Sequence, residues 1–165
     1  MQKIILGLFA TASLAGCTSS DYGKKVTIEG SKGEVYYKGD GVTEADAKKL
    51  GEYLTTIVHY FKAENPSSVQ LTKAKDEGYD IRLAVDENKL NDFTQANEVY
   101  AKNLGALLSI DLYDNKPVNI FITDIHFKES KSIPFDPEEV KKVQEKRNPA
   151  DITEPVADTT GNNNQ

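Results

Sequence analysis

The chain has 165 residues, of which 20 are basic and 26 acidic, and its net charge at pH 7 is −6. Strong apolar periodicity is confined to residues 24–128, which is enough for one domain with a real core and too little for two. The acidic balance offers no basic stripe that would release counterions from phosphates, so the composition argues against nucleic-acid binding.

The first residues predict a secretory signal. Lys3 precedes an apolar run from Ile4 to Ala12, which is shorter than the roughly 20 residues needed to span a bilayer. The run leads into Leu14-Ala15-Gly16-Cys17, and the chain then becomes polar. Cys17 is the only cysteine. This stretch resembles the lipobox of bacterial lipoprotein precursors.

The resemblance implies cleavage between Gly16 and Cys17 and a membrane anchor of two or three acyl chains on Cys17. Such an anchor would be permanent, since one chain alone holds only marginally. The alternative is a plain secreted protein with a free thiol. Removing residues 1–16 takes away Lys3, which leaves 19 basic and 26 acidic side chains and a net charge of −7. We expect anionic headgroups to repel this body. The residue after the cysteine is Thr18 rather than Asp, which resembles the pattern of lipoproteins that leave the inner membrane. Outer-membrane placement is therefore favoured.

The chain divides into a signal peptide (1–16), a lipidated tether (17–23), a globular domain (24–135), a short helix (136–147) and a disordered tail (148–165). Lys24–Glu29 and Glu34–Lys38 alternate apolar and polar residues around a glycine-containing loop, which predicts a hairpin. Thr43 is the expected N-cap of a helix that continues to Asn65-Pro66. Its apolar face comprises Ala47, Leu50, Leu54, Ile57, Val58 and Phe61.

The second half is expected to contain two strands, a helix and a last strand. Residues 68–72 and 79–86 alternate as half-buried strands on either side of Glu77-Gly78. A second helix is expected to begin near Asp92. Its inner face would comprise Phe93, Ala96, Tyr100, Leu104, Leu107 and Leu108. Residues 118–123 form the last expected strand.

These elements predict an α+β fold, with a small antiparallel sheet and two helices on one face. The order indicates the split β-α-β (ferredoxin-like) arrangement, preceded by an extra N-terminal strand. Right-handed crossovers would then place both helices on the same side. The predicted core sets Ile81, Leu83 and Val85 against Leu54 and Leu104. A simpler two-helix, hairpin-based sandwich is the alternative.

Few residues indicate catalytic chemistry. We interpret His59 as a partly buried or surface residue. Asp124 and His126 could offer two metal ligands, but zinc needs three or four. The acid pairs Asp76-Glu77 and Asp86-Glu87 do not have the spacing of a calcium loop and are interpreted as solvated loop acids. A carboxylate pair for sugar hydrolysis cannot be recognised among 26 acids. We therefore expect no cofactor, no metal and no enzymatic activity.

A contact surface is the more promising feature. Tyr36 and Tyr37 are adjacent on one strand, so their rings point to opposite faces. Together with Phe121 and Ile125, one of them would form an apolar patch on the outer sheet face, and such patches often mark contacts. The competing interpretation is that residues 126–135, or the short C-terminal helix, cover this face.

Three functions remain open. The first is a non-catalytic protein-interaction or structural module of the cell envelope. The second is a small-ligand-binding lipoprotein, and the third an envelope enzyme. The run from Gly33 to Tyr37, leading to residues 42–51, resembles small domains of uncharacterised bacterial envelope lipoproteins. That resemblance implies no site residue.

Overall fold

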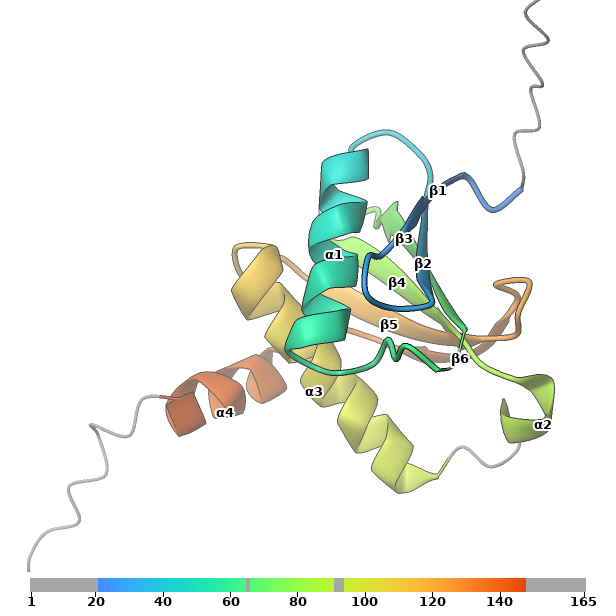
Figure 1. Ribbon diagram of the computed structural model, residues 1–165. Helices are drawn as coiled ribbons and strands as arrows, with labels where there is room; N and C mark the ends of the chain where they lie inside the picture. The colour runs from blue at the N-terminus through green and yellow to red at the C-terminus, as the bar shows by residue number, and fades with distance from the viewer. Residues whose placement is uncertain (1–20, 65, 91–93, 148–165) are drawn as a thin grey trace, which may run out of the picture.

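The computed structural model describes residues 21–64, 66–90 and 94–147. Within these ranges the chain folds as a mixed α+β protein with six strands and four helices (Figure 1). The signal peptide, Cys17 and the C-terminal tail lie outside the described residues. The elements are β1 (Lys24–Thr27), β2 (Gly33–Tyr37), α1 (Glu44–Thr56), β3 (Ser67–Lys73), β4 (Tyr79–Ala84), α2 (Glu87–Leu90), α3 (Gln95–Leu112), β5 (Val118–Thr123), β6 (Glu129–Ile133) and α4 (Pro137–Arg147).

The six strands form one sheet in which they lie in chain order, β1 to β6. The β2–β3 and β4–β5 pairs are parallel, and the other three pairs are antiparallel. The prediction of a small antiparallel sheet in the split β-α-β arrangement was therefore wrong. That arrangement needs the first strand of the unit, here β2, to have a neighbour at each edge from within the unit. The extra strand β1 occupies one edge of β2, so only one edge remains, and β3 takes it.

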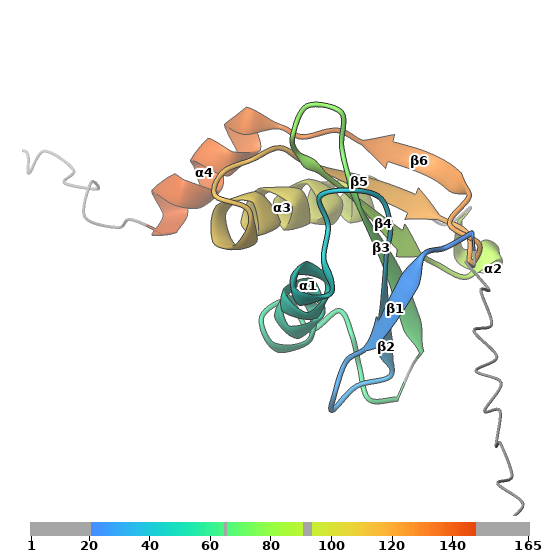
Figure 2. The ribbon, with the colours of Figure 1, turned by 90° about the horizontal axis from the view of Figure 1, so that it is seen from above.

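Helices α1 and α3 both lie on the same face of the sheet (Figures 1 and 2). Gly51 of α1 packs on Val35, and Gly105 of α3 packs on Ile120. These two strand residues point to the same side in the paired register. Because the chain direction reverses between β3 and β4, two crossovers on one face have opposite hands, and one of them is left-handed. The expectation that both crossovers would be right-handed was therefore wrong, although about 98% of such connections are right-handed.

The core fills the space between this face and the two helices. Val85 is only partly buried, whereas the rest of the predicted core set is at most 3% exposed. The largest fully buried apolar side chains are Leu50, Leu54, Leu71, Ile81, Leu104, Leu108 and Ile120. Burying each of them contributes roughly 1.5–3 kcal/mol.

Helix α1 begins as predicted and ends earlier. The Thr43 side chain accepts a bond from the Asp46 amide, and the Asp46 side chain accepts one from the Thr43 amide, which is a capping box. The helix stops at Thr56 rather than at residue 65. The run from Thr55 to Val58 is β-branched and disfavours helix, and the hydroxyls of Thr55 and Thr56 bond to carbonyls one turn back. Ile57 consequently leaves the core and is 58% exposed.

The second half departs further from the sequence prediction. The N-cap of α3 is Thr94, and Asp92 and Phe93 lie outside the described residues. Tyr100 is 47% exposed, because the buried face of α3 runs instead through Ala101, Leu104 and Leu108. Two elements were missed, the short α2 and strand β6. The β6 sequence, ESKSI, has a single buried residue, so its apolar alternation is too weak to predict a strand.

Helix α4 forms where the sequence predicts a short helix, and it packs against α3. Its buried residues Val140 and Val143 contact Ala106 of α3. Near its end, Arg147 donates two hydrogen bonds to Asp111 of α3, at 2.6 and 3.0 Å. The same carboxylate accepts a hydrogen bond from Tyr53 of α1. Helix α4 therefore reinforces the helical side and does not cover the other face of the sheet.

Candidate functional site

None of the described helices lies on the second face of the sheet, and we call it the open face (Figures 1 and 2). Strand alternation places Tyr36, Gln70, Arg82 and Phe121 side by side in one row across β2 to β5. The row continues to Ser132 on β6. Polar residues dominate this row because the apolar residues of each strand point to the core. The candidate site is built on this row.

Four aromatic rings gather over one end of the open face, and we call them the aromatic cap. Tyr22, just before β1, meets Tyr36 and Phe127 edge to face, at 6.0 and 5.7 Å between ring centroids. Phe127 also meets Tyr36, at 5.5 Å. The fourth ring is His126, whose Nδ1 lies 2.8 Å from the Tyr22 hydroxyl. Beneath the cap, Gln70 is only 2% exposed, and its amide donates to the Tyr22 carbonyl at 3.0 Å.

Charged side chains support the outer edge of the cap. The Tyr36 hydroxyl donates to Glu34 at 3.0 Å, and Lys25 donates to the same carboxylate at 2.7 Å. The hydrogen bond from Lys25 lowers the pKa of Glu34. Burial, followed by the bond to Glu34, raises the pKa of Tyr36. At neutral pH Glu34 is therefore ionised and Tyr36 protonated, which is the state that these bonds require.

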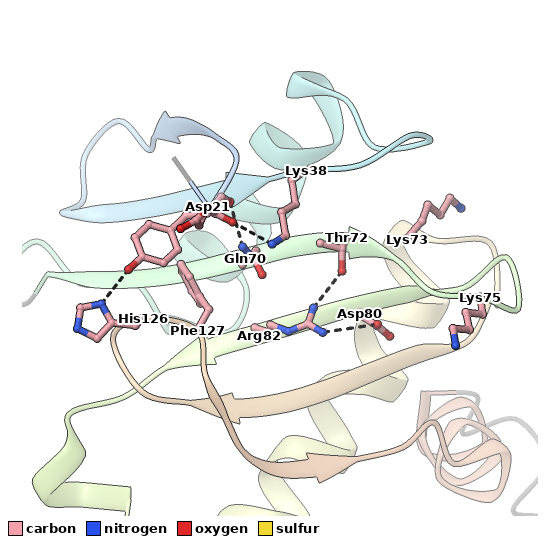
Figure 3. Close-up of a pocket in the computed structure, with 11 residues that line it drawn as sticks. Asp21, Lys38, Gln70, Thr72, Lys73, Lys75, Asp80, Arg82, His126 and Phe127 are labelled. Carbon is pink, nitrogen blue, oxygen red and sulfur yellow. Dashed lines mark hydrogen bonds and ion pairs between the residues drawn. The ribbon is translucent and has the colours of Figure 1, made fainter. Parts of the chain in front are cut away.

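Beside the cap the open face is hollowed, with a volume of about 490 Å³. We call this cavity the basic hollow, because four basic and two acidic side chains line it in a chain that is acidic overall. Its walls come from β3 and β4, from Lys38 just after β2, from Lys75 in the β3–β4 turn and from the segments that form the cap. The lining residues are Asp21, Tyr22, Lys38, Gln70, Thr72, Lys73, Lys75, Asp80, Arg82, His126 and Phe127 (Figure 3).

Arg82 lies at the floor of the basic hollow. Its side chain is 22% exposed, and its guanidinium lies 4.7 Å from the centre of the Phe121 ring. One nitrogen donates to the Thr72 hydroxyl at 3.0 Å, and another lies 4.0 Å from Asp80, at the limit of an ion pair. Asp80 also accepts a bond from Asn119 at 2.9 Å. A guanidinium has five N–H donors, so most of the Arg82 donors have no partner within the described residues.

The lysines of the basic hollow have no carboxylate partner among the described residues. Lys38 donates to the Asp21 carbonyl at 2.9 Å, and Lys73 donates to the Glu77 carbonyl at 3.1 Å. Lys75 is exposed and makes no hydrogen bond or ion pair with the described part of the chain. Figure 3 shows Lys38, Gln70, Thr72 and Arg82 around a common space. This arrangement suits an anion.

The four residues predicted to form a contact surface lie in different surroundings in the structure. Tyr36 is half-buried in the aromatic cap, whereas Tyr37 belongs to the core, at 8% exposure. Phe121 is half-buried beneath Arg82. Ile125, in the β5–β6 turn, is 59% exposed. No continuous apolar patch links these four residues, and the β5–β6 turn covers part of the open face through Phe127.

The histidines and loop acids have local roles. His59 is exposed at the end of α1, with Nδ1 3.1 Å from the Thr55 carbonyl. Asp124 accepts bonds from the amides of His126 and Lys128, which closes the β5–β6 turn. Exposed Asp76 and Asp86 likewise accept amide bonds in their own turns. Among the described residues, no group of three or more potential ligands could hold a metal ion.

Two smaller features lie away from the open face. A cavity of about 460 Å³ beside α3 is lined largely by apolar side chains, among them Tyr60, Leu83 and Ile122. Another, of about 180 Å³, is lined by Asp46 and Tyr113, among others. The Tyr113 hydroxyl is buried without a partner in the described residues, and burial raises the pKa of Tyr113. The larger cavity has one charged lining residue, and the smaller one has two lysines and two aspartates, so neither has the excess of basic residues found in the basic hollow.

Sequence reasoning missed the residues that matter most here, namely Tyr22, Lys38, Gln70 and Arg82. A signal existed for two of them, because Gln70 and Arg82 occupy the polar positions of their alternating strands. Their proximity depends on strand order, which the sequence did not reveal.

The fold and site define an α+β domain with one helix-covered face and one open, hollowed face. Residues 25–133 match the AF_1994_N family N-terminal domain, and the chain therefore belongs to this family. The matched residues cover the sheet from β1 to β6. No curated protein and no solved structure matches the chain. None of the described helices is both long enough and apolar enough to cross a bilayer.

Proposed function

We propose that this protein is a lipid-anchored envelope lipoprotein that works as a non-catalytic binding module and meets a protein partner at the rim of its open face, through the β5–β6 turn. The anchor is the acylated Cys17, and the outer membrane is the favoured location. The lipobox residues Leu14 to Cys17 and the single cysteine support the anchor.

The observation that carries the proposal is the contrast between the two sheet faces. Helices α1 and α3 pack on one face, whereas the other displays a row of side chains of which Tyr36, Gln70 and Arg82 are held by hydrogen bonds. Gln70 and Arg82 are fixed there before any ligand arrives, and preorganisation lowers the entropy cost of binding. Ile125, 59% exposed in the β5–β6 turn, adds an apolar contact at the rim of the open face.

The hydrogen-bond partners of the polar side chains in the basic hollow are consistent with a non-catalytic role. Nucleophilic catalysis needs a hydroxyl or thiol beside a base. The Thr72 hydroxyl lies beside Arg82, a cation with no lone pair to accept a proton. The one hydroxyl beside an imidazole in the described lining is the phenol of Tyr22, 2.8 Å from His126, and its ring is packed edge to face within the aromatic cap. An enzyme therefore remains the least favoured of the three functions.

Small-ligand binding is the second candidate, and the basic hollow itself favours it. A volume of about 490 Å³ lies within the range of small-molecule sites. A thermal-shift screen tests this candidate, since a ligand at 100 times its dissociation constant adds about 2.7 kcal/mol of stability. A screen of small anions that shifts no melting temperature would remove it.

Photo-crosslinking in intact cells tests the main proposal with a matched pair of positions. Ile125 and Ile57 are the same residue type with almost equal exposure, 59% and 58%. Ile125 lies in the β5–β6 turn, whereas Ile57 caps α1 on the helical side. A photoreactive residue at position 125 should give a discrete protein adduct that position 57 does not give. The same adduct from both positions, or none from position 125, contradicts the proposal.

A further inference from the structure

The N-terminal tether joins the domain on the open face, and hydrogen bonds fix the place where it joins. The Asp21 carbonyl accepts a bond from Lys38 at 2.9 Å, and the Tyr22 carbonyl accepts one from Gln70 at 3.0 Å. The Tyr22 side chain is part of the aromatic cap. Asp21 and Tyr22 also line the basic hollow. The tether therefore ends at the edge of this cavity.

The remaining tether is short. Four residue steps separate Cys17 from Asp21, and a fully extended chain spans at most about 3.5 Å per residue, or about 14 Å in all. If Cys17 carries the acyl chains, the edge of the basic hollow cannot move further than this from the bilayer surface. The helical side, across the sheet, then faces away from the membrane.

We infer that the basic hollow binds the phosphate group of an anionic membrane lipid, so that the open face is oriented toward the bilayer. This inference rests on the proposed anchor and adds to it a ligand for the cavity. It leaves the exposed β5–β6 turn, with Ile125, for the protein partner.

The side chains of the cavity match a phosphate. Arg82 offers a planar fork of donors, which binds phosphate oxygens in pairs, and Lys38 offers a point charge with donors beyond the one bonded to Asp21. Figure 3 shows both reaching the space above Gln70 and Thr72. Lys75 adds a third cation at the cavity without an ion-pair partner among the described residues.

The charge of the whole chain restricts the mode of binding. The body is acidic, so a flat approach to an anionic surface is repelled. The attraction is local to the basic hollow, where Lys38, Lys75 and Arg82 outnumber the two acidic residues of the lining. The fourth basic residue, Lys73, points its ammonium to the Tyr79 ring instead, at 3.8 Å from the ring centre. We therefore expect one headgroup held in the cavity rather than a broad electrostatic contact.

The single cysteine allows the inference to be tested independently of natural acylation. The processed chain, residues 17–165, is coupled through Cys17 to a maleimide-bearing lipid in vesicles. One set of vesicles contains phosphatidylcholine alone, and the other an equal mixture with phosphatidylglycerol. The readout is the acetylation rate of individual lysines, measured by mass spectrometry. Lys38 and Lys75 report on the cavity, and exposed Lys141 of α4 is the internal control.

Lys38 and Lys75 should react about fivefold more slowly on the phosphatidylglycerol vesicles, which corresponds to about 1 kcal/mol per basic residue at an anionic surface. Lys141 should react equally on both. Arg82→Gln should abolish the protection of Lys38, whereas Arg82→Lys should keep part of it. Chemical unfolding shows whether each variant is folded, and a variant that fails to fold is replaced by Lys38→Gln with Lys75 as reporter.

Equal rates on the two vesicle types would overturn the inference, as would protection that survives Arg82→Gln. Inorganic phosphate is added to the phosphatidylcholine vesicles at matched ionic strength. If it protects the lysines equally well, the cavity takes free phosphate and the lipid assignment is wrong. Because the maleimide supplies the anchor, these outcomes do not depend on whether cells acylate Cys17, which the mass of the native protein decides separately.

Discussion

Different interactions hold the side chains on the two faces of the sheet. On the helical face, apolar side chains such as Leu54 and Ile81 are fully buried, so their stability comes from transfer out of water. On the open face, Gln70 is almost as deeply buried but is a polar residue, held by a hydrogen bond to the tether. The first face closes the fold, and the second leaves charged groups in position for a ligand. The difference suggests that stability and binding can be changed separately.

The largest effect is expected on the helical face. Leu54→Ala should lower the free energy of unfolding by about 3 kcal/mol, because it opens a cavity among fully buried residues. Ile57→Ala, on the exposed cap of the same helix, should cost less than about 0.5 kcal/mol. Urea unfolding of both variants measures the contrast. Similar losses from the two would show that α1 is not seated on the core as described.

Substitutions in the aromatic cap should lower the free energy of unfolding less than Leu54→Ala does, and they test a residue with a strained backbone conformation. Phe127 has φ of 58°, a left-handed conformation that is costly for any residue with a Cβ. Phe127→Ala should cost about 1–2 kcal/mol, because the ring contacts are lost while the strain remains. Phe127→Gly should cost about 1 kcal/mol less than the alanine variant, since glycine accepts this φ. If alanine is the milder substitution in urea unfolding, the conformation given for this turn is wrong.

The attachment of α4 should depend on pH. Arg147 holds the pKa of Asp111 below its usual range through hydrogen bonds. A lowered pKa in the folded state stabilises the fold above the unfolded value, near pH 4, and this stability is lost as the pH falls through the lowered pKa. Arg147→Gln should therefore cost about 1 kcal/mol at pH 7. The cost should shrink toward zero at acid pH, and a pH-independent cost in urea titrations would contradict this assignment.

The smallest effect on stability is expected where the partner is proposed to bind. Ile125→Glu should change the free energy of unfolding by less than about 0.5 kcal/mol, since the side chain is 59% exposed. The same substitution should weaken the crosslinks formed from photoreactive residues placed elsewhere in the β5–β6 turn. A large loss of stability would mean that this turn is structural and not a free contact surface.

The sequence predicted local structure better than arrangement. The capping box at Thr43 and the alternation of residues 79–84 depend on neighbours in the chain, and both were found from the sequence. The predicted hairpin of β1 with β2 is confirmed, but it leaves β2 a single free edge, which rules out the predicted strand order. Strand β6 was missed because it buries one residue, Ile133, and owes its place to hydrogen bonds with β5.

The candidate site was less predictable than the fold for the same reason. Five strands, β1 to β5, separate Tyr22 from His126 and Phe127 in the chain, and only the folded sheet brings these rings together. The sequence indicated that one of Tyr36 and Tyr37 would face outward, and the structure identifies it as Tyr36. The sequence could not indicate that Arg82 would lie on Phe121, because that contact needs the parallel pairing of β4 with β5.

The most direct test of the whole account is the mass of the mature protein purified from membranes of the native cell. We predict a chain that begins at Cys17 and carries two or three fatty acyl groups on that residue. A mature chain that retains residues 1–16, or one with an unmodified Cys17, would contradict the account.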